Sequence, residues 1–148
     1  MCGIVGIISS KEVTARIINS LKKLEYRGYD SAGIATLVDG NINEVKCEGR
    51  VEALEKDITK FNLRGDIGIG HVRWATHGKP SKINAHPHSS DQVSVVHNGI
   101  IENSTILKKF LEKKGYVFKS QTDTEVIAHL VSEYLKKNSL KNTIIKVL

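Results

Sequence analysis

A cysteine stands at position 2 of this chain, directly before a short apolar run. Gly3–Ser9 is rich in Ile and Val, which predicts a buried strand with a thiol at its very start. A small residue at position 2 lets the initiator Met1 be trimmed, which would leave Cys2 at the true amino terminus. One residue would then combine a thiol with a pKa of about 8.5 and an α-amine with a pKa of about 7.7–8.0. Such an amine can take the thiol proton and later return it to a leaving group.

The rest of the chain shows strand patterns first and helix patterns later. The turn signal Asp39-Gly40-Asn41 separates two strand patterns and predicts a hairpin. The polar stretch His77–Gln92 contains both prolines and is expected to be a long loop, of the kind that often forms a functional lid. The predicted strands are Gly3–Ser9, Ala32–Val38, Ile42–Cys47, Ile67–Arg73 and Val93–His97. The predicted helices are Val13–Leu24, Val51–Lys60, Ser104–Lys114, Asp123–Lys137 and Leu140–Leu148. This order favours an α+β fold over an alternating parallel sheet.

The helix patterns near the end of the chain also predict their own boundaries and inner faces. Gly115 is a natural C-cap for the helix before it, and Thr122 with Glu125 has the spacing of a capping box. The side chains expected to face inward are Leu107, Phe110, Leu111, Val126, Ile127, Leu130, Val131 and Tyr134. The last helix runs to the end of the chain without a cap, which predicts a truncated domain.

Composition limits the class of protein. A chain of 148 residues with 40% hydrophobic and 26% charged residues predicts one soluble globular domain. It has no apolar run of about 20 residues and no signal peptide, so we expect a cytoplasmic protein without a membrane segment. The net charge of +6 comes from 17 Lys and 5 Arg, and the lysines are mostly paired on predicted helices. That pattern indicates solvated helix faces rather than a nucleic-acid site. Cys2 and Cys47 are not expected to form a disulfide in a reducing compartment.

Four residue clusters carry the functional signal, and Thr122-Asp123-Thr124-Glu125 follows them. They are Cys2-Gly3-Ile4-Val5-Gly6, Tyr26-Arg27-Gly28-Tyr29-Asp30-Ser31-Ala32-Gly33, His71-Val72-Arg73-Trp74-Ala75-Thr76-His77-Gly78 and His97-Asn98-Gly99-Ile100-Ile101-Glu102-Asn103. In this order they closely resemble the glutaminase domain of the glutamine–fructose-6-phosphate aminotransferases (glucosamine-6-phosphate synthases), which are class II glutamine amidotransferases. Tyr26, Tyr29 and the Trp74-Ala75 pair match that hexosamine branch rather than the amidotransferases that use phosphoribosyl pyrophosphate.

The resemblance implies an N-terminal-nucleophile (Ntn) hydrolase fold, an αββα sandwich of two stacked antiparallel sheets between helical layers. Cys2 would be the nucleophile. The Asn98 side-chain amide and the Gly99 backbone N–H would form the oxyanion hole. Arg27 would sit beside the nucleophile. Glycine at the oxyanion hole would let the backbone come close to the substrate, and one oxyanion donor is worth about 10²–10³ in rate.

The resemblance also implies how the substrate, L-glutamine, would be held. Arg73 would bind the α-carboxylate with its planar fork, and Asp123 would bind the α-ammonium. Thr76 and His77 would line the pocket for this head group. The segment Trp74–Ser81 would close over the site as a lid and exclude water.

The same resemblance sets expectations for cofactors, partners and domains. It implies no cofactor and no metal. Fructose-6-phosphate would bind only to sugar-isomerase domains that these residues do not contain, and full-length relatives would be homo-oligomers. Residues 1–148 would be a truncated glutamine amidotransferase domain. The alternatives are the glutaminase domain of a related amidotransferase, or a non-catalytic remnant whose unfinished second sheet exposes an edge and an apolar face. A nucleic-acid-binding module is a third alternative, supported by net charge alone.

Several site residues also have a purely structural interpretation. Asp123 would favour the dipole in the first turn of a helix. Arg73 and Trp74 would pack on each other at a strand end. Arg27 would cap the helix before it, and Asn98-Gly99 would be an ordinary tight turn.

The glycines and histidines have alternatives of their own. Gly68 and Gly70 would mark strand bulges. A metal site would draw on His71, His77, His86, His88 and His97. No cysteine or carboxylate completes a familiar zinc spacing with these histidines, which argues against the metal.

Overall fold

The computed structural model describes residues 1–75 and 78–147 of the chain. Its larger sheet has four antiparallel strands in the order β1-β4-β2-β3. These are β1 (Gly3–Ile8), β2 (Ser31–Val38), β3 (Asn41–Glu48) and β4 (Ile67–Arg73). All four coincide with predicted strands to within two residues. The predicted hairpin joins β2 to β3 through Asp39 and Gly40, which both have positive φ angles of 50° and 78°.

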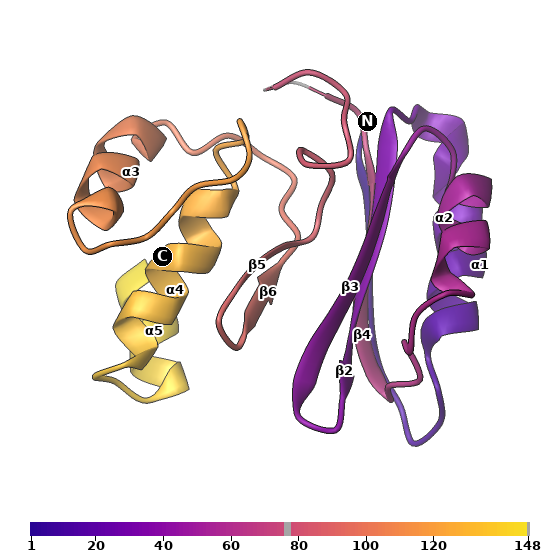
Figure 1. The fold of residues 1–148 in the computed structure, drawn as a ribbon, viewed down its shortest axis with the longest axis horizontal. Coiled ribbons are helices and arrows are strands. Elements are labelled where there is room, and N and C mark those ends of the chain that lie inside the picture. The colour runs from indigo at the N-terminus through magenta and orange to yellow at the C-terminus, as the bar shows by residue number, and fades with distance from the viewer. Residues whose placement is uncertain (76–77, 148) are drawn as a thin grey trace.

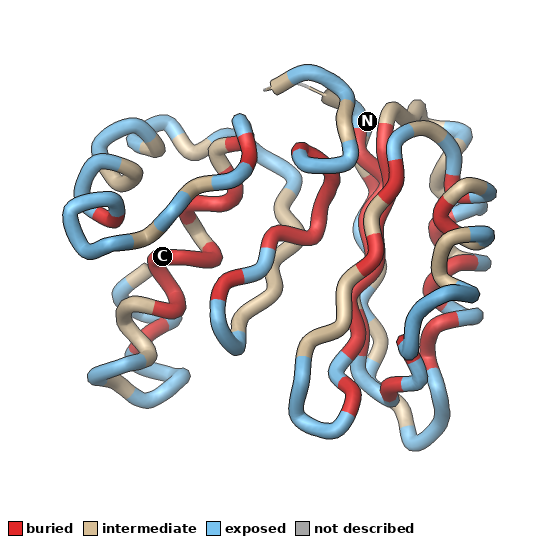
Figure 2. The backbone as a smooth tube through the Cα atoms, viewed as in Figure 1, coloured by how far each residue is buried: buried red, intermediate tan, exposed pale blue. Residues whose placement is uncertain are grey.

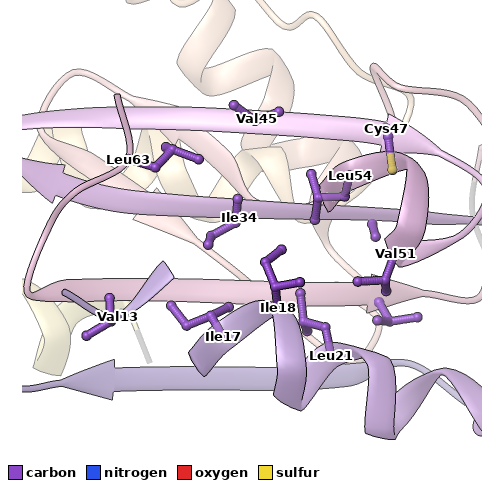
Figure 3. Close-up of a cluster of buried hydrophobic side chains, with 12 residues drawn as sticks. Val13, Ile17, Ile18, Leu21, Ile34, Val45, Cys47, Val51, Leu54 and Leu63 are labelled. Atoms are coloured by element: carbon purple, nitrogen blue, oxygen red, sulfur yellow. The ribbon is translucent and has the colours of Figure 1, made fainter. Parts of the chain in front are cut away.

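Two helices, α1 (Thr14–Leu24) and α2 (Val51–Ile58), cover one face of this sheet (Figure 1). Buried residues of α1 recur every three or four positions and meet the sheet in one apolar cluster, drawn in Figure 3. Gly68 and Gly70 on β4 lie under α1, since a Cβ added at Gly70 would be 2.5 Å from Ile17. The pairing of β4 with both neighbours is continuous, so the bulge alternative is wrong: these glycines make room for the helix.

The second sheet contains β5 (His88–Ser90) and β6 (Val93–Val95), paired antiparallel. The strand β5 lies inside the stretch that the sequence predicts to be a loop. The prediction was wrong there because the two inward side chains of β5, His88 and Ser90, are polar. Burial alternates along β5 as in an ordinary strand, but the buried and the exposed residues are all polar, so the sequence shows no alternation of apolar and polar residues.

Helices α3 (Ser104–Glu112), α4 (Glu125–Leu135) and α5 (Leu140–Val147) form the outer layer beside β5 and β6 (Figure 1). Leu111, Val126 and Leu130 make a second buried cluster there. The C-cap of α3 is Lys113 rather than the predicted Gly115, which lies in the turn that follows, with a φ of 91°. Phe110 does not face inward as predicted, because 42% of it is exposed and its ring packs under the Lys114 ammonium.

The predicted capping box at the start of α4 is also wrong. The helix begins at Glu125, and Thr124 occupies the N-cap without a side-chain hydrogen bond. The Glu125 carboxylate instead accepts hydrogen bonds from the backbone N–H groups of Lys119 and Ser120. It therefore ties down the segment before the helix rather than the helix end.

The layers thus run in the order α1 and α2, larger sheet, β5 and β6, then α3 to α5, which confirms the α+β sandwich of two antiparallel sheets between helices. Figure 2 shows burial along the larger sheet, the face of α1 beneath it and much of α4. Beside β6, a groove of about 420 Å³ is lined largely by apolar side chains of β6, α4 and α5. None of the helices in the described part of the chain is long and apolar enough to cross a membrane.

Candidate functional site

A cleft of about 570 Å³ opens where the start of β1, the end of β4, the segment after β6 and the segment before α4 meet. It brings together seven of the nine predicted site residues. Its walls contain Met1, Cys2, Arg27, His71, Arg73, Trp74, His86, His97, Asn98, Gly99, Ile100, Thr122, Asp123 and Thr124. The other two predicted residues, Thr76 and His77, lie outside the described residues.

The Cys2 thiol is placed by strand pairing. Gly3 on β1 pairs with Val72 on β4, so Cys2 lies beside the end of β4. Its sulfur accepts a hydrogen bond from the Trp74 backbone N–H at 3.1 Å and lies 3.4 Å from the Trp74 carbonyl oxygen. Cys2 is half-buried, whereas Cys47 is 5% exposed on β3, where burial raises the pKa of its thiol. Cys2 is therefore the more accessible of the two thiols.

Met1 occupies part of the cleft wall. Its α-amine donates to the Arg27 carbonyl at 2.6 Å, and an Arg27 guanidinium nitrogen lies 3.7 Å from the Met1 sulfur. Arg27 belongs to a short 3₁₀ turn, Glu25–Arg27, that follows α1. Its side chain reaches the amino terminus instead of capping α1. With Met1 attached, the Cys2 nitrogen is a peptide nitrogen and carries no basic lone pair.

Asn98 is tied to two other parts of the cleft. Its Nδ2 donates to the Cys2 carbonyl at 3.4 Å, and its Oδ1 lies 2.9 Å from His71 Nε2. Gly99 comes so close to the ring of His97 that an added Cβ would be 2.7 Å from His97 Nε2. The Asn98 side-chain amide thus connects Cys2 to His71, two contacts that an ordinary tight turn would not require.

Arg73 is held by a residue that the sequence analysis missed. Only 4% of its side chain is exposed, and its guanidinium contacts Asp30 at 3.5 Å and the Gly78 carbonyl at 3.0 Å. Asp30 also accepts the backbone N–H of Ala75. The sole hint was the position of Asp30 in the second motif cluster. Trp74 lies against Gly28, where any Cβ would overlap its ring, so its packing partner is the glycine.

Asp123 lies just before α4, not in its first turn. Its Oδ2 accepts the Ile101 backbone N–H at 2.6 Å. The helix-dipole interpretation fails because the helix begins at Glu125. The carboxylate instead connects the segment after Gly99 to the segment before α4, and Asp123 lines the cleft together with Asn98.

Three buried histidines lie ring against ring between the two sheets: His86 stacks on His71 and meets His88 edge-on. We call these three residues the imidazole column. Neighbouring ring centroids are 4.4 Å and 4.7 Å apart. Burial lowers the pKa of His71 to about 4 and that of His88 to about 3, and it lowers the pKa of His86 as well. All three are therefore neutral near pH 7.

Hydrogen bonds connect the imidazole column to residues that line the cleft. His88 Nε2 lies 2.8 Å from the Thr122 hydroxyl, and His86 Nδ1 accepts the His97 backbone N–H at 3.4 Å. Across residues 1–75 and 78–147, no group of three or more His, Cys, Asp or Glu side chains is placed to hold a metal ion. The sequence marked these histidines only as metal candidates, whereas the structure gives them partners in and beside the cleft.

Comparison with known proteins identifies the family and the fold of the chain. The residue pattern of the family described as "Glutamine amidotransferase domain" matches residues 71–144, half of the chain. The structure of the glutamine phosphoribosylpyrophosphate amidotransferase from B. subtilis, complexed with ADP and GMP, matches with a TM-score of 0.79 at 30% identity. That match covers 99% of this chain and 32% of the other. The chain therefore belongs to the glutamine amidotransferase domain family and has the fold of the Ntn-type amidotransferases.

Its sequence relatives are more specific. The chain is 55% identical over 150 residues to a glutamine–fructose-6-phosphate aminotransferase (isomerizing) from Clostridium acetobutylicum, covering 100% of this chain and 24% of that protein. It is 56% identical over 137 residues to one from Mesorhizobium japonicum, covering 93% and 23%. These matches confirm the resemblance found in the motifs. The chain spans about a quarter of the length of these relatives and is homologous to their glutaminase portion.

Proposed function

We propose that this chain hydrolyses the side-chain amide of L-glutamine with Cys2 as its nucleophile. The observation that carries the proposal is one cleft lined by the Cys2 thiol, the Asn98 amide and the side chains of Arg73 and Asp123. Amide hydrolysis of an amino acid needs this combination: a nucleophile, an oxyanion donor and one anchor of each charge for the head group.

The reaction would proceed in two halves. The Cys2 sulfur attacks the amide carbon, a C–S bond forms, and negative charge develops on the amide oxygen. Asn98 Nδ2 and the Gly99 N–H stabilise that oxygen. The C–N bond then breaks, and the nitrogen leaves as ammonia with the proton that came from the thiol. Water attacks the thioester next, which gives glutamate and restores the thiol.

The proton transfer would require Met1 to be removed. We assign the base to the α-amine of Cys2, which exists only after trimming. The amine has a reference pKa of about 7.7–8.0, so a useful fraction is unprotonated at neutral pH. The nitrogen of a peptide bond cannot serve in this role. The active form in this proposal therefore begins at Cys2.

The head group of glutamine would lie between the two charged walls. Arg73 binds the α-carboxylate, and its ion pair with Asp30 orients it for that contact. Asp123 binds the α-ammonium, because a carboxylate has about four lone-pair sites and the Ile101 N–H takes only one. Thr76 and His77 complete the pocket in this proposal, and Trp74–Ser81 closes over it.

The names of the relatives extend the proposal to a whole protein. We propose that the ammonia serves glucosamine-6-phosphate synthesis, with fructose-6-phosphate bound by domains outside these 148 residues. Such a protein would be a cytoplasmic homo-oligomer, and residues 1–148 would act as one glutaminase unit. The reducing cytoplasm suits a site that depends on a free thiol.

The first test is intact mass before and after exposure to a glutamine analogue that carries a chloroketone in place of the amide. We expect loss of the Met1 mass and one stoichiometric adduct on Cys2. Cys2→Ser should lose the adduct and the release of ammonia from glutamine, while calorimetry still detects glutamine binding. Cys47→Ser is the matched control and should label like the parent, because Cys47 is buried on β3.

Two results would contradict the proposal. Turnover by Cys2→Ser comparable to the parent would refute the nucleophile. A parent chain that unfolds cooperatively, has lost Met1 and still takes no adduct would favour the non-catalytic alternative. A non-cooperative thermal profile would favour the same alternative, because the site would then not be assembled in this chain.

A further inference from the structure

We infer that His71 is a positioning residue of the oxyanion hole: its neutral imidazole donates from Nε2 to Asn98 Oδ1 and so turns Asn98 Nδ2 toward Cys2. This inference rests on the function proposed above, because it adds a residue to the same site. His71 itself does not touch the reacting atoms. It acts through Asn98, which lies on an exposed segment after β6.

The first argument is the orientation of the Asn98 amide. One end of this amide is a donor and the other is an acceptor. In the observed orientation, the donor end faces the Cys2 carbonyl at 3.4 Å and the acceptor end faces His71 at 2.9 Å. A reversed amide would place two acceptors, Asn98 Oδ1 and the Cys2 carbonyl oxygen, against each other. Asn98 Nδ2 therefore faces Cys2 as an oxyanion donor only while a hydrogen-bond donor, here His71, faces Asn98 Oδ1.

The second argument is the proton on the His71 ring. Burial is the main cause that lowers the pKa of His71, so the ring is neutral and carries one proton. Its Nδ1 is buried and has no hydrogen-bond partner among the described residues. A proton on Nδ1 would leave an unpaired buried N–H, whereas a bare Nδ1 leaves only an unpaired acceptor, which proteins tolerate more readily. The proton therefore belongs on Nε2, where it meets Asn98 Oδ1.

The third argument is the rigidity of the support. His71 is fully buried on β4, and its ring stacks on His86 with an interplanar angle of 21°. His86 in turn accepts the backbone N–H of His97, the residue before Asn98. The imidazole column thus holds both the side chain of Asn98 and the backbone that leads into it. A preorganised donor of this kind needs no reorganisation during the reaction.

The test compares His71→Leu, which removes the donor, with His71→Gln, which supplies an amide donor in its place. The readouts are kcat and KM for glutamine hydrolysis and the rate of Cys2 labelling by the chloroketone analogue, whose carbonyl oxygen would occupy the oxyanion hole. For His71→Leu we expect both rates to fall by about 10²-fold, the worth of one oxyanion donor, with KM within about threefold of the parent. His71→Gln should recover to within about tenfold of the parent.

A double-mutant cycle with Asn98→Ala separates positioning from general damage. His71→Leu should cost nothing further in the Asn98→Ala background, because the group it positions is already gone. His129→Gln is the matched control, since it removes another buried imidazole, on α4, that contacts Ser90 and does not line the cleft. It should lower the unfolding temperature and leave the labelling rate within about threefold of the parent.

The outcomes distinguish this inference from the proposed function. If Asn98→Ala labels as fast as the parent, the proposed oxyanion hole is wrong. If Asn98→Ala is slow and His71→Leu is fast, only the role of His71 is wrong. If His71→Leu does not fold, the cycle is run with His71→Phe, which keeps a ring beside His86 but has no donor. An equal loss from His71→Phe with and without Asn98 would then overturn the inference, and a loss confined to the Asn98 background would support it.

Discussion

Gly33 on β2 is the point where the larger sheet comes closest to the segment that leads into β5. A Cβ added there would lie well inside 3.0 Å of the His86 carbonyl oxygen and 2.9 Å from Cγ of Lys46. The Lys46 side chain can turn aside, but a backbone carbonyl moves only with its whole segment. Gly33→Ala is therefore expected to push the two layers apart at the imidazole column.

The size of the effect follows from this contact. Overpacking typically costs about 1–3 kcal/mol, and a clash with backbone belongs at the upper end of that range. For a chain of this length, each kcal/mol lowers the unfolding temperature by roughly 2–4 °C. We therefore expect a drop of roughly 6–12 °C by calorimetry or circular dichroism. Cys2 labelling should slow as well, because His86 supports the backbone before Asn98.

Gly6→Ala is the matched control on β1 of the same sheet. The nearest atom to a Cβ at Gly6 is Ile69 Cγ2 at 4.0 Å, which is an ordinary contact. Its unfolding temperature should stay within about 2 °C of the parent. If Gly33→Ala and Gly6→Ala unfold at the same temperature, the layers are not in close contact at Gly33, and the reasoning is refuted.

Three further predictions concern binding, pH and packing. Arg73→Ala should raise KM for glutamine by about 10–100-fold with a smaller change in kcat, because it removes a charged ground-state contact; an unchanged KM in steady-state assays would contradict this role. Folding lowers the pKa of each histidine in the imidazole column below the unfolded value of about 6.5, so the unfolded chain binds more protons below that pH. The free energy of unfolding should thus stay constant above pH 6.5 and fall as the pH drops toward 4. The slope should be about 1.4 kcal/mol per pH unit for each histidine, or about 4 kcal/mol per pH unit for the three together. Urea unfolding at pH 7.5 and 5.5 measures this difference, and equal free energies of unfolding would refute the burial argument. Leu111→Ala should cost about 2–5 kcal/mol in the same urea titration, since Leu111 is fully buried under α4; a loss below about 1 kcal/mol would show that the cluster is loosely packed.

Runs of Ile and Val, one turn signal and one apolar helix face predicted the bounds of the larger sheet and α1 to within two residues. The expected burial of Gly3–Ser9 was wrong, because β1 is an edge strand in which Ile4 is 42% and Ile8 is 82% exposed. The strand β5 was missed because its inward residues are His88 and Ser90. Phe110 was misplaced because an aromatic ring on a helix edge can be covered by a lysine instead of the core.

The site was predictable only for residues in recognisable motifs. The motif resemblance supplied Cys2, Arg73 and Asn98, and the structure places all three in one cleft. Asp30 and His71 were missed because they act through other residues. Their contacts join positions 43 and 27 residues apart in the chain, a separation at which no local spacing reveals a partner.

Met1 belongs to the cleft wall, and its amine lies 2.6 Å from the Arg27 carbonyl. Met1, the residue directly before Cys2, thus already fills space in the cleft beside the thiol. The other end of the described chain lies in the helical layer, away from the amino terminus (Figure 1). An affinity tag or fusion partner therefore belongs at the carboxyl end. In the mechanism proposed above, a tag ahead of Cys2 would turn its α-amine into a peptide nitrogen and so remove the base.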